Sequence, residues 1–378
     1  MANETTFKFE PIESRPSQSK DEHPVWCDYL ELLCVITPGR QLSRGEIIDA
    51  AFNEGRDLDL EEASEDSGDT MFFREKDFDD FPYESGDIVP SADSIGSSAA
   101  LASDNVNRVV DDWYKHLAAR SDMFGDMYPF ELDIKKDLIS LKNGTAVKPS
   151  HDLYLYLLLA SNLKLFSRNL MSRITTDFEA ICFNAQRYMF PLSLPKIGSD
   201  THLFGKSSNT QSIFRGSLAE KFEQLSKLIN SNKVDVSEMR ANNSGDRGLD
   251  VISIVKFKDD SAFGMPLLLA QCACSYKDWK KKQNDHSSSR YRQHLLFDVE
   301  YLRAIYIPFL YRANSGKWFD SSEISTIVID RLRIMNILGA TAKNEFKLAK
   351  KWADLVLFDN EVDRALYCEY IIEDKQSA

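Results

Sequence analysis

The chain has 378 residues, of which 43% are hydrophobic and 28% are charged. This composition is typical of a globular protein, and it excludes collagen-like, wholly disordered and small disulfide-stapled classes. The net charge is −13, but residues 57–87 alone hold thirteen acidic and two basic residues, so the remaining chain carries only −2. Because the body of the protein is nearly neutral, the overall acidity does not exclude a nucleic-acid partner.

The cysteines and the apolar runs indicate the compartment. Six cysteines are scattered among apolar residues without a CxxC pair or a zinc-type spacing, and this usage is typical of reduced thiols in the cytosol. Residues 1–19 are polar, and the longest apolar run, near 153–159, is far too short to span a membrane. We therefore expect a cytoplasmic protein with no membrane contact.

Residues 1–150 are expected to form a mainly helical N-terminal region. Ser43 followed by Glu46 is a capping-box pattern that predicts a helix start. A segment rich in Ser, Ala and Asp at 91–103 is typical of a linker or an exposed loop. The expected elements are an apolar helix or strand at 26–36, a helix at 43–52, the acidic stretch at 57–87, the linker, a helix at 105–120 and a short helix or strand at 133–141.

The acidic stretch, residues 57–87, has two interpretations. Its charge density is typical of a solvated loop. Aromatic residues interleave with the acids, however, and such a mixture could dock on a basic partner or occupy a basic groove as a nucleic-acid mimic. These aromatic residues are Phe72, Phe73, Phe78, Phe81 and Tyr83.

Residues 151–378 are expected to form a second part in which helices and strands alternate. The segment GLDVISIVKF at 248–257 alternates with β-branched residues and predicts a strand, and a hairpin loop at 258–264 leads to a second, apolar strand at 265–274. The other expected strands are at 304–311 and 325–330. Helices are expected at 151–167, 171–190, 218–229, 276–283, 294–302, 331–338 and 341–357, and a loop at 204–216.

Three residues in this order carry a family resemblance. Glu179 lies in the helix at 171–190, Asp250 in the first strand and Gln271 in the second strand, within LLLAQCACS. A helix, two strands, a helix and a strand in succession, with acidic or amide residues at these places, resemble the core of the PD-(D/E)xK nucleases over residues 175–330. The resemblance implies an α/β (α+β) fold with a restriction-endonuclease-like αββαβ core.

The resemblance also implies a metal site. Asp250 would bridge to Mg²⁺ or Mn²⁺, Glu179 would be a second ligand, Gln271 would offer its side-chain oxygen and Cys272 its backbone carbonyl. These hard oxygen donors suit such ions, which activate water and neutralise charge when a phosphodiester bond is hydrolysed.

The sequence departs from the family motif at the lysine, because Ala273 stands two residues after Gln271. A lysine on the following basic helix could replace it, and the candidates are Lys277 and Lys280. The helix also carries Lys281 and Lys282 and aromatic residues, which suit phosphate contacts, although such a charge run is often only a solvated face.

Three functions follow as hypotheses. The first is a metal-dependent endonuclease acting on DNA, which resembles effector subunits of bacterial anti-phage defence systems that pair with a helicase or ATPase. No P-loop is present, since Gly205–Ser208 lacks the first glycine of that motif. The second is a non-catalytic subunit that binds or assembles with other proteins. The third is an acidic adaptor or inhibitor acting through residues 57–87. The sequence leaves a homo-oligomer open.

Overall fold

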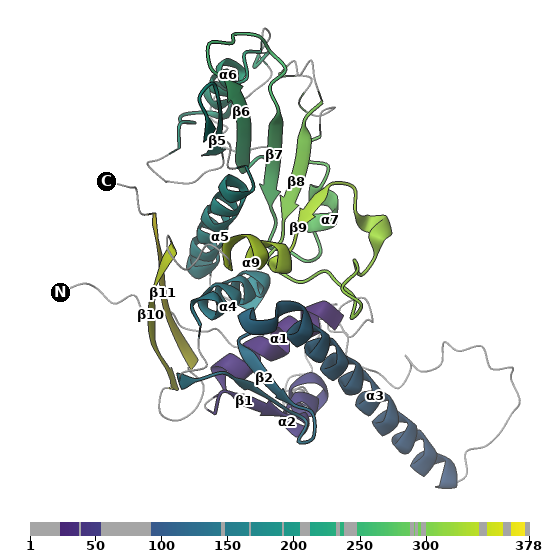
Figure 1. Ribbon diagram of the computed structural model, residues 1–378. Coiled ribbons are helices and arrows are strands. Elements are labelled where there is room, and N and C mark those ends of the chain that lie inside the picture. The colour runs from purple at the N-terminus through teal and green to yellow at the C-terminus, as the bar shows by residue number, and fades with distance from the viewer. Residues whose placement is uncertain are drawn as a thin grey trace, which may run out of the picture. The chain divides into compact units, whose positions relative to one another are not determined.

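The chain is described by a computed structural model (Figure 1). The described residues are 23–37, 39–53, 92–144, 148–165, 168–190, 193–204, 212–231, 235–237, 248–287, 291, 294–295, 300–339, 346–357 and 364–374. Contacts group the chain into two units, Ser43–Tyr114 and the combination of Met1–Leu42 with Lys115–Ala378. This grouping differs from the predicted division at residue 150, and each unit is described by itself.

The smaller unit contains a capped helix and the first part of a long one. Helix α2 (Arg44–Ile48) begins after Ser43, whose side chain and that of Glu46 form the predicted capping box, and it continues into the π-helical turn η2 (Asp49–Asn53). Helix α3 (Ala92–Phe124) starts in this unit. The expected linker at 91–103 is therefore wrong from Ala92 onward, because its many alanines favour a helix. The acidic stretch at 57–87 lies outside the described residues.

The larger unit begins with helices and a small sheet. The ambiguous segment at 26–36 belongs to helix α1 (His23–Ile36), and the expected helix at 151–167 is α4 (Pro149–Ser161), followed by the short turn η6 (Leu163–Leu165). The turn η4 (Gly125–Met127) follows α3. Three short strands form a sheet in the order β1–β3–β2: β1 (Gln41–Ser43), β2 (Phe130–Asp133) and β3 (Leu138–Leu141).

A cluster of buried charges joins these helices to one another. Asp28 and Glu31 on α1 face Arg120 on α3 and Arg331 on α9 (Arg331–Gly339), and all four side chains are at most 2% exposed. Since two carboxylates meet two guanidinium groups, the cluster is electrically balanced. We call these four residues the buried charge cluster. It links α1 to α9, the helix that follows the last strand of the main sheet.

The main sheet has six strands in the order β4–β5–β6–β7–β8–β9. Neighbouring strands from β4 to β7 are antiparallel, whereas β7, β8 and β9 run parallel. The strands are β4 (Ser193–Leu194), β5 (Ile197–Leu203), β6 (Val251–Phe257), β7 (Leu267–Cys272), β8 (Leu302–Tyr306) and β9 (Ile327–Ile329). Short turns α7 (Trp279–Lys282) and η7 (Ser321–Glu323) connect the parallel strands.

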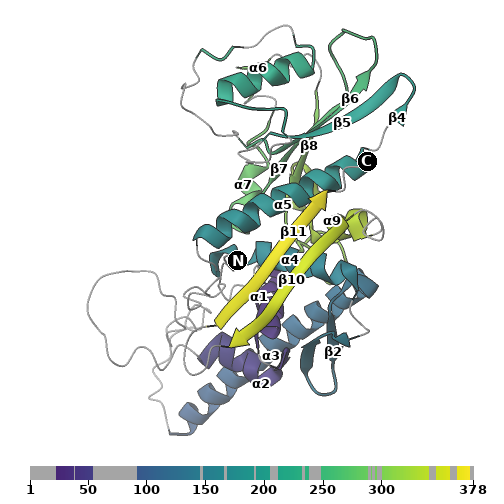
Figure 2. The ribbon, with the colours of Figure 1, turned by 90° about the vertical axis from the view of Figure 1, so that its left-hand side faces the viewer.

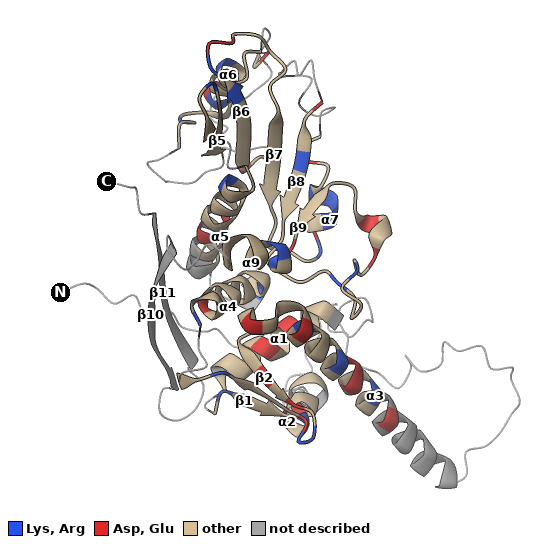
Figure 3. Cartoon of the chain, viewed as in Figure 1, with Lys and Arg blue, Asp and Glu red and all other residues tan. Residues whose placement is uncertain are grey.

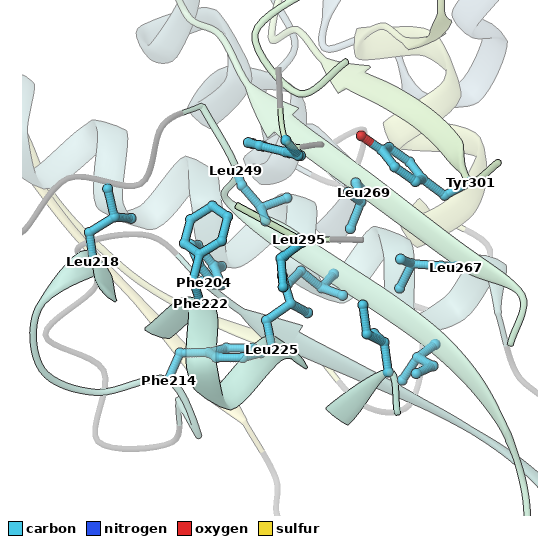
Figure 4. Close-up of a cluster of buried hydrophobic side chains, with 14 residues drawn as sticks. Phe204, Phe214, Leu218, Phe222, Leu225, Leu249, Leu267, Leu269, Leu295 and Tyr301 are labelled. Atoms are coloured by element: carbon cyan, nitrogen blue, oxygen red, sulfur yellow. The ribbon is translucent and has the colours of Figure 1, made fainter. Parts of the chain in front are cut away.

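Different helices cover the two faces of this sheet (Figure 2). Helix α6 (Leu218–Leu228) packs Phe222 and Leu225 against Leu267 and Leu269 in one apolar cluster (Figure 4). Helix α5 (Arg168–Met189) lies on the opposite face, where Gln186 bonds to β6 and β7. Because successive strand residues point to opposite faces, alternate side chains of β7 face α6 and α5.

The fold is mixed α/β, as predicted, but some elements differ from the expectation. Strand β5 was not expected, and Leu302 belongs to β8 rather than to a helix at 294–302. The expected helix at 341–357 is wrong, since residues 346–357 form strand β10 (Phe346–Leu357), paired with β11 (Arg364–Asp374). Pairing with the next strand along the chain overrides local helix propensity here. No helix in the described part of the chain is long and apolar enough to cross a membrane.

Candidate functional site

Backbone hydrogen bonds hold Asp250 beside the end of strand β7. Its N–H donates to the carbonyl of Ala270 (2.9 Å), and its carbonyl accepts from the N–H of Phe204 (2.7 Å). Its Oδ2 accepts a hydrogen bond of 2.6 Å from the N–H of Cys272. The residue is only 5% exposed. The carboxylate is therefore fixed beside the last residue of β7.

The turn before Asp250 requires glycine. Gly248 has φ of +77°, which side-chain-bearing residues rarely adopt. A Cβ atom there would lie 2.6 Å from Cβ of Asp285 and 2.9 Å from Nε2 of Gln271. The close approach of these two side chains thus depends on the missing side chain of Gly248.

Glu179 reaches the same region from helix α5. Glu179, Cys182 and Gln186 are spaced by three and four residues and so share one face of the helix. Nε2 of Gln186 donates to Oγ of Ser253 (3.0 Å) and to the carbonyl of Leu268 (3.3 Å). One turn away, the thiols of Cys182 and Cys272 lie close enough for each to influence the pKa of the other. These contacts direct the face that carries Glu179 onto the sheet at the end of β7.

Both carboxylates act electrostatically on a group of thiols at this place. Burial raises the pKa of Cys182, Cys272 and Cys274, and the negative charges of Asp250 and Glu179 raise each of the three further. The thiols therefore stay protonated at neutral pH and are poor metal ligands. The two carboxylates of the site, which come from different elements, are its hard oxygen donors.

Gln271 lies on the other face of the sheet. It lies two residues after Leu269 and therefore shares the face that packs towards α6, whereas its neighbour Cys272 points to the face covered by α5. Its Nε2 is 3.5 Å from Oδ2 of Asp285, and its buried Oε1 has no hydrogen-bond partner among the described residues. The structure therefore places the Asp250 carboxylate against Cys272 and directs the face of α5 that carries Glu179 to the same end of β7, whereas the Gln271 side chain lies on the other face of the sheet.

The position of the motif lysine is filled by a small apolar side chain. Ala273 is fully buried and packs with Trp279 and Ile305 in an apolar cluster. The two predicted replacements lie elsewhere: Lys277 is exposed, and Nζ of Lys280 is 2.5 Å from Oε1 of Glu323.

Lys282 was not among the predicted catalytic residues, although it is the lysine whose charge acts on the Cys274 thiol together with Glu179 and Asp250. The sequence held one signal that Lys282 and Lys280 have different surroundings: they lie two residues apart, and residues two apart on a helix point in nearly opposite directions.

None of the family models, curated proteins or solved structures compared with this chain matches it. The chemistry of the site is therefore inferred from its residues alone.

The donor set suits a small divalent cation that keeps part of its water shell. The described part of the chain holds no group of three or more His, Cys, Asp or Glu side chains that could enclose a metal ion. Mg²⁺, however, is commonly held by one or two carboxylates, with water and substrate phosphate completing its octahedron. Asp250 and Glu179, with the backbone carbonyl of Cys272, fit that mode of binding.

Proposed function

We propose that this chain is a metal-dependent nuclease that hydrolyses phosphodiester bonds of DNA. The observation that carries the proposal is the position of two carboxylates at the end of β7. Oδ2 of Asp250 accepts from the N–H of Cys272 (2.6 Å), and Glu179 shares the face of α5 on which Gln186 donates to the carbonyl of Leu268 (3.3 Å). They come from a strand start and a helix that lie 71 residues apart in the sequence. Such a pair of hard oxygen donors is suited to Mg²⁺ or Mn²⁺.

The order of the elements supports the same proposal. Helix α5 is followed by the antiparallel strands β5, β6 and β7, then by α7 and the parallel strand β8. This succession resembles the restriction-endonuclease-like core, with Glu179 on its helix and Asp250 and Cys272 at the ends of its central strands. Helix α6 is an insertion between β5 and β6.

In the proposed reaction, a water oxygen forms a bond to phosphorus while the bond to one ester oxygen breaks, and that oxygen leaves with a proton. A bound cation would neutralise the developing charge and favour ionisation of water. Asp250 and Glu179 would hold it, and the hydrogen bond from Cys272 N–H would keep the Asp250 carboxylate oriented. Gln271 and its neighbour Asp285 would support the turn at Gly248 from the opposite face.

One observation favours the alternative of a non-catalytic binding or assembly subunit. The motif lysine has been replaced by Ala273, which is packed in an apolar cluster where an ammonium group would be desolvated. A chain that kept the sheet and lost the lysine could still bind nucleic acid or a partner protein. The two functions differ in whether the chain cuts DNA.

The test is cleavage of supercoiled and linear DNA, double- and single-stranded, with Mg²⁺ or Mn²⁺. We expect the wild type to cut and Asp250→Asn and Glu179→Gln to lose cutting, since both replacements keep the shape of the side chain and remove its charge. Asp259→Asn is the matched control, because Asp259 is exposed in the loop at the far end of β6 and asparagine tolerates its φ of +66°.

The control variant should cut as fast as the wild type. Equal cutting by Asp250→Asn and the wild type would contradict the proposed site. If the folded wild type cuts none of these substrates, the binding or assembly subunit becomes the better interpretation. In a bacterial defence system, such a chain would work beside a helicase or ATPase subunit, which size-exclusion chromatography of the co-expressed proteins would detect.

A further inference from the structure

The start of helix α4 is capped by a histidine ring. Lys148 is the N-cap residue of α4, and its side chain has no oxygen that could accept a hydrogen bond from the first turn. Instead, Nδ1 of His151, three residues later, accepts a hydrogen bond of 3.2 Å from the N–H of Lys148. This contact is one half of a capping box, in which the histidine takes the place of a glutamate or glutamine.

The other ring nitrogen ties α4 to the turn that follows α3. Nε2 of His151 lies 3.0 Å from the carbonyl oxygen of Asp126 in η4. A carbonyl oxygen only accepts, so Nε2 carries the ring proton, and a backbone N–H only donates, so Nδ1 is bare. The two contacts therefore fix one neutral form of the ring. The residue is 2% exposed, which leaves water little access to either contact.

Two other buried histidines are bonded differently. Nδ1 of His116 faces Oδ1 of Asn314 (2.7 Å), and Nδ1 of His294 faces the carbonyl oxygen of Asp235 (2.9 Å). In both, the bonded ring nitrogen donates to an oxygen, and a second proton on the ring would leave that bond intact. A second proton on His151 would instead set two N–H groups against each other at Nδ1. Protonation of His151 therefore breaks the cap.

The charges around this ring favour its neutral form. Asp126 comes from η4, Lys142 follows β3, and Lys148 and Asp152 belong to the start of α4, where Figure 3 shows basic and acidic residues close together. Burial lowers the pKa of His151, and the charges of Lys142 and Lys148 lower it further. The bond to the Asp126 carbonyl and the charge of Asp152 oppose this shift without cancelling it.

We propose that His151 is a pH-sensitive latch, closed while its ring is neutral and opened by protonation, which releases the first turn of α4 from η4. The inference does not rest on the proposed nuclease function. The latch lies beside the buried charge cluster, because α3 carries Arg120, and Tyr154 of α4 donates to Glu31 of the cluster (2.9 Å). Acid would thus loosen the two segments that lead into the cluster.

Hydrogen exchange of the full chain, followed by mass spectrometry and corrected for the intrinsic rate at each pH, tests the latch. A released His151 has its ordinary pKa of about 6.5, so the open population should rise by up to about thirtyfold between about pH 7.5 and about pH 5. Residues 125–128 and 148–154 should lose about tenfold to thirtyfold in protection. Residues 267–272 of β7 report global unfolding and should change less.

Three variants separate the latch from a general effect of acid. Glutamine at this position of a capping box accepts from the N-cap N–H and does not titrate, so in His151→Gln the loss of protection should shrink to under about threefold. His151→Ala removes the acceptor and should lower the protection of residues 148–154 at both pH values. His294→Gln is the matched control and should keep the wild-type response. Urea unfolding shows whether each variant is folded.

The outcomes decide the proposal even where His151→Ala does not fold. An equal loss of protection in His151→Gln and the wild type overturns it, as does a loss shared equally by residues 267–272. Nitrogen-15 NMR of the wild-type ring gives an independent readout. At neutral pH, Nδ1 should be bare and Nε2 protonated, and the opposite form or a doubly protonated ring would overturn the latch.

Discussion

Replacing Arg120 with methionine unbalances the buried charge cluster. Nη1 of Arg120 lies 2.6 Å from Oδ1 of Asp28 and 3.0 Å from Oε1 of Glu31, and Nη2 donates to the carbonyl of Pro24 (2.6 Å). Without this guanidinium, two buried carboxylates face Arg331 alone. Breaking a fully buried pair by removing one partner costs about 3–5 kcal/mol, because an uncompensated charge stays inside. That is a large part of the 5–15 kcal/mol typical of a domain's stability.

The protonation of Asp28 depends on the same balance. Burial alone would raise the pKa of Asp28, but the charges of Arg331 and Arg120 outweigh burial and hold that pKa below its ordinary value. Tyr128 and Tyr154 donate hydrogen bonds to Glu31 (2.8 and 2.9 Å), so both oxygens of that carboxylate remain hydrogen-bonded in the variant. The loss in Arg120→Met is therefore mainly one of charge compensation.

Urea unfolding at neutral pH measures this loss. Arg120→Met should lower the free energy of unfolding by about 3–5 kcal/mol with an unchanged m-value. Lys136→Met is the matched control, because Lys136 pairs with Asp133 at 3.3 Å on the surface, where the two side chains are 76% and 39% exposed. Its cost should stay below about 1 kcal/mol.

A double variant tests the reasoning further. Glu31→Gln removes one negative charge, so Arg120→Met combined with Glu31→Gln should be less destabilised than the sum of the two single variants. A loss below about 1 kcal/mol in Arg120→Met, or strict additivity in the double variant, would refute charge compensation as the role of the cluster.

Three further predictions concern the region around the candidate site. Gly248→Ala should lower the free energy of unfolding by about 1–3 kcal/mol in urea, because of its positive φ and the 2.6 Å approach to Asp285; an unchanged stability would show that the turn adapts. Burial, aided by the charge of Arg303, lowers the pKa of His286 to about 4. In the unfolded chain this histidine has its ordinary pKa of about 6.5, so as the pH falls the unfolded chain binds the proton before the folded chain does. Stability should drop by about 2 kcal/mol between pH 7 and pH 5, and His286→Gln should remove this share, which a pH series of urea titrations checks. Ser217→Ala, which breaks the capping box of α6, should cost about 1 kcal/mol in thermal or urea unfolding, and a loss under a few tenths would argue that α6 is held by packing alone.

Much of the local structure could be predicted because its causes are local. Ser43 and Glu46 predicted the start of α2, and the alternation of GLDVISIVKF predicted the strand that became β6. The same patterns placed Glu179 on a helix and Gln271 on a neighbouring strand. These features depend on helix capping and on the two-residue period of a strand, both of which can be seen in a few consecutive residues.

Two of the errors concern strands, whose stability depends on their partners. Strand β5 has little apolar character, but seven of its residues pair with β6. Strand β10, in a segment expected to be helical, pairs with β11. A strand gains its hydrogen bonds from a partner strand, so its own residues need not show a strong pattern.

The sequence by itself determined the capped helices, the two central strands and the types of side chain near their ends. Only the tertiary structure decided on which face each side chain lies, and this separates Gln271 from Glu179 and Asp250. It also joined Asp28 to Arg331 across 303 residues and directed Lys280 to Glu323. The physical reason is that charges and hydrogen bonds act through space, and the packing of α5, α6 and α7 on the sheet sets those distances.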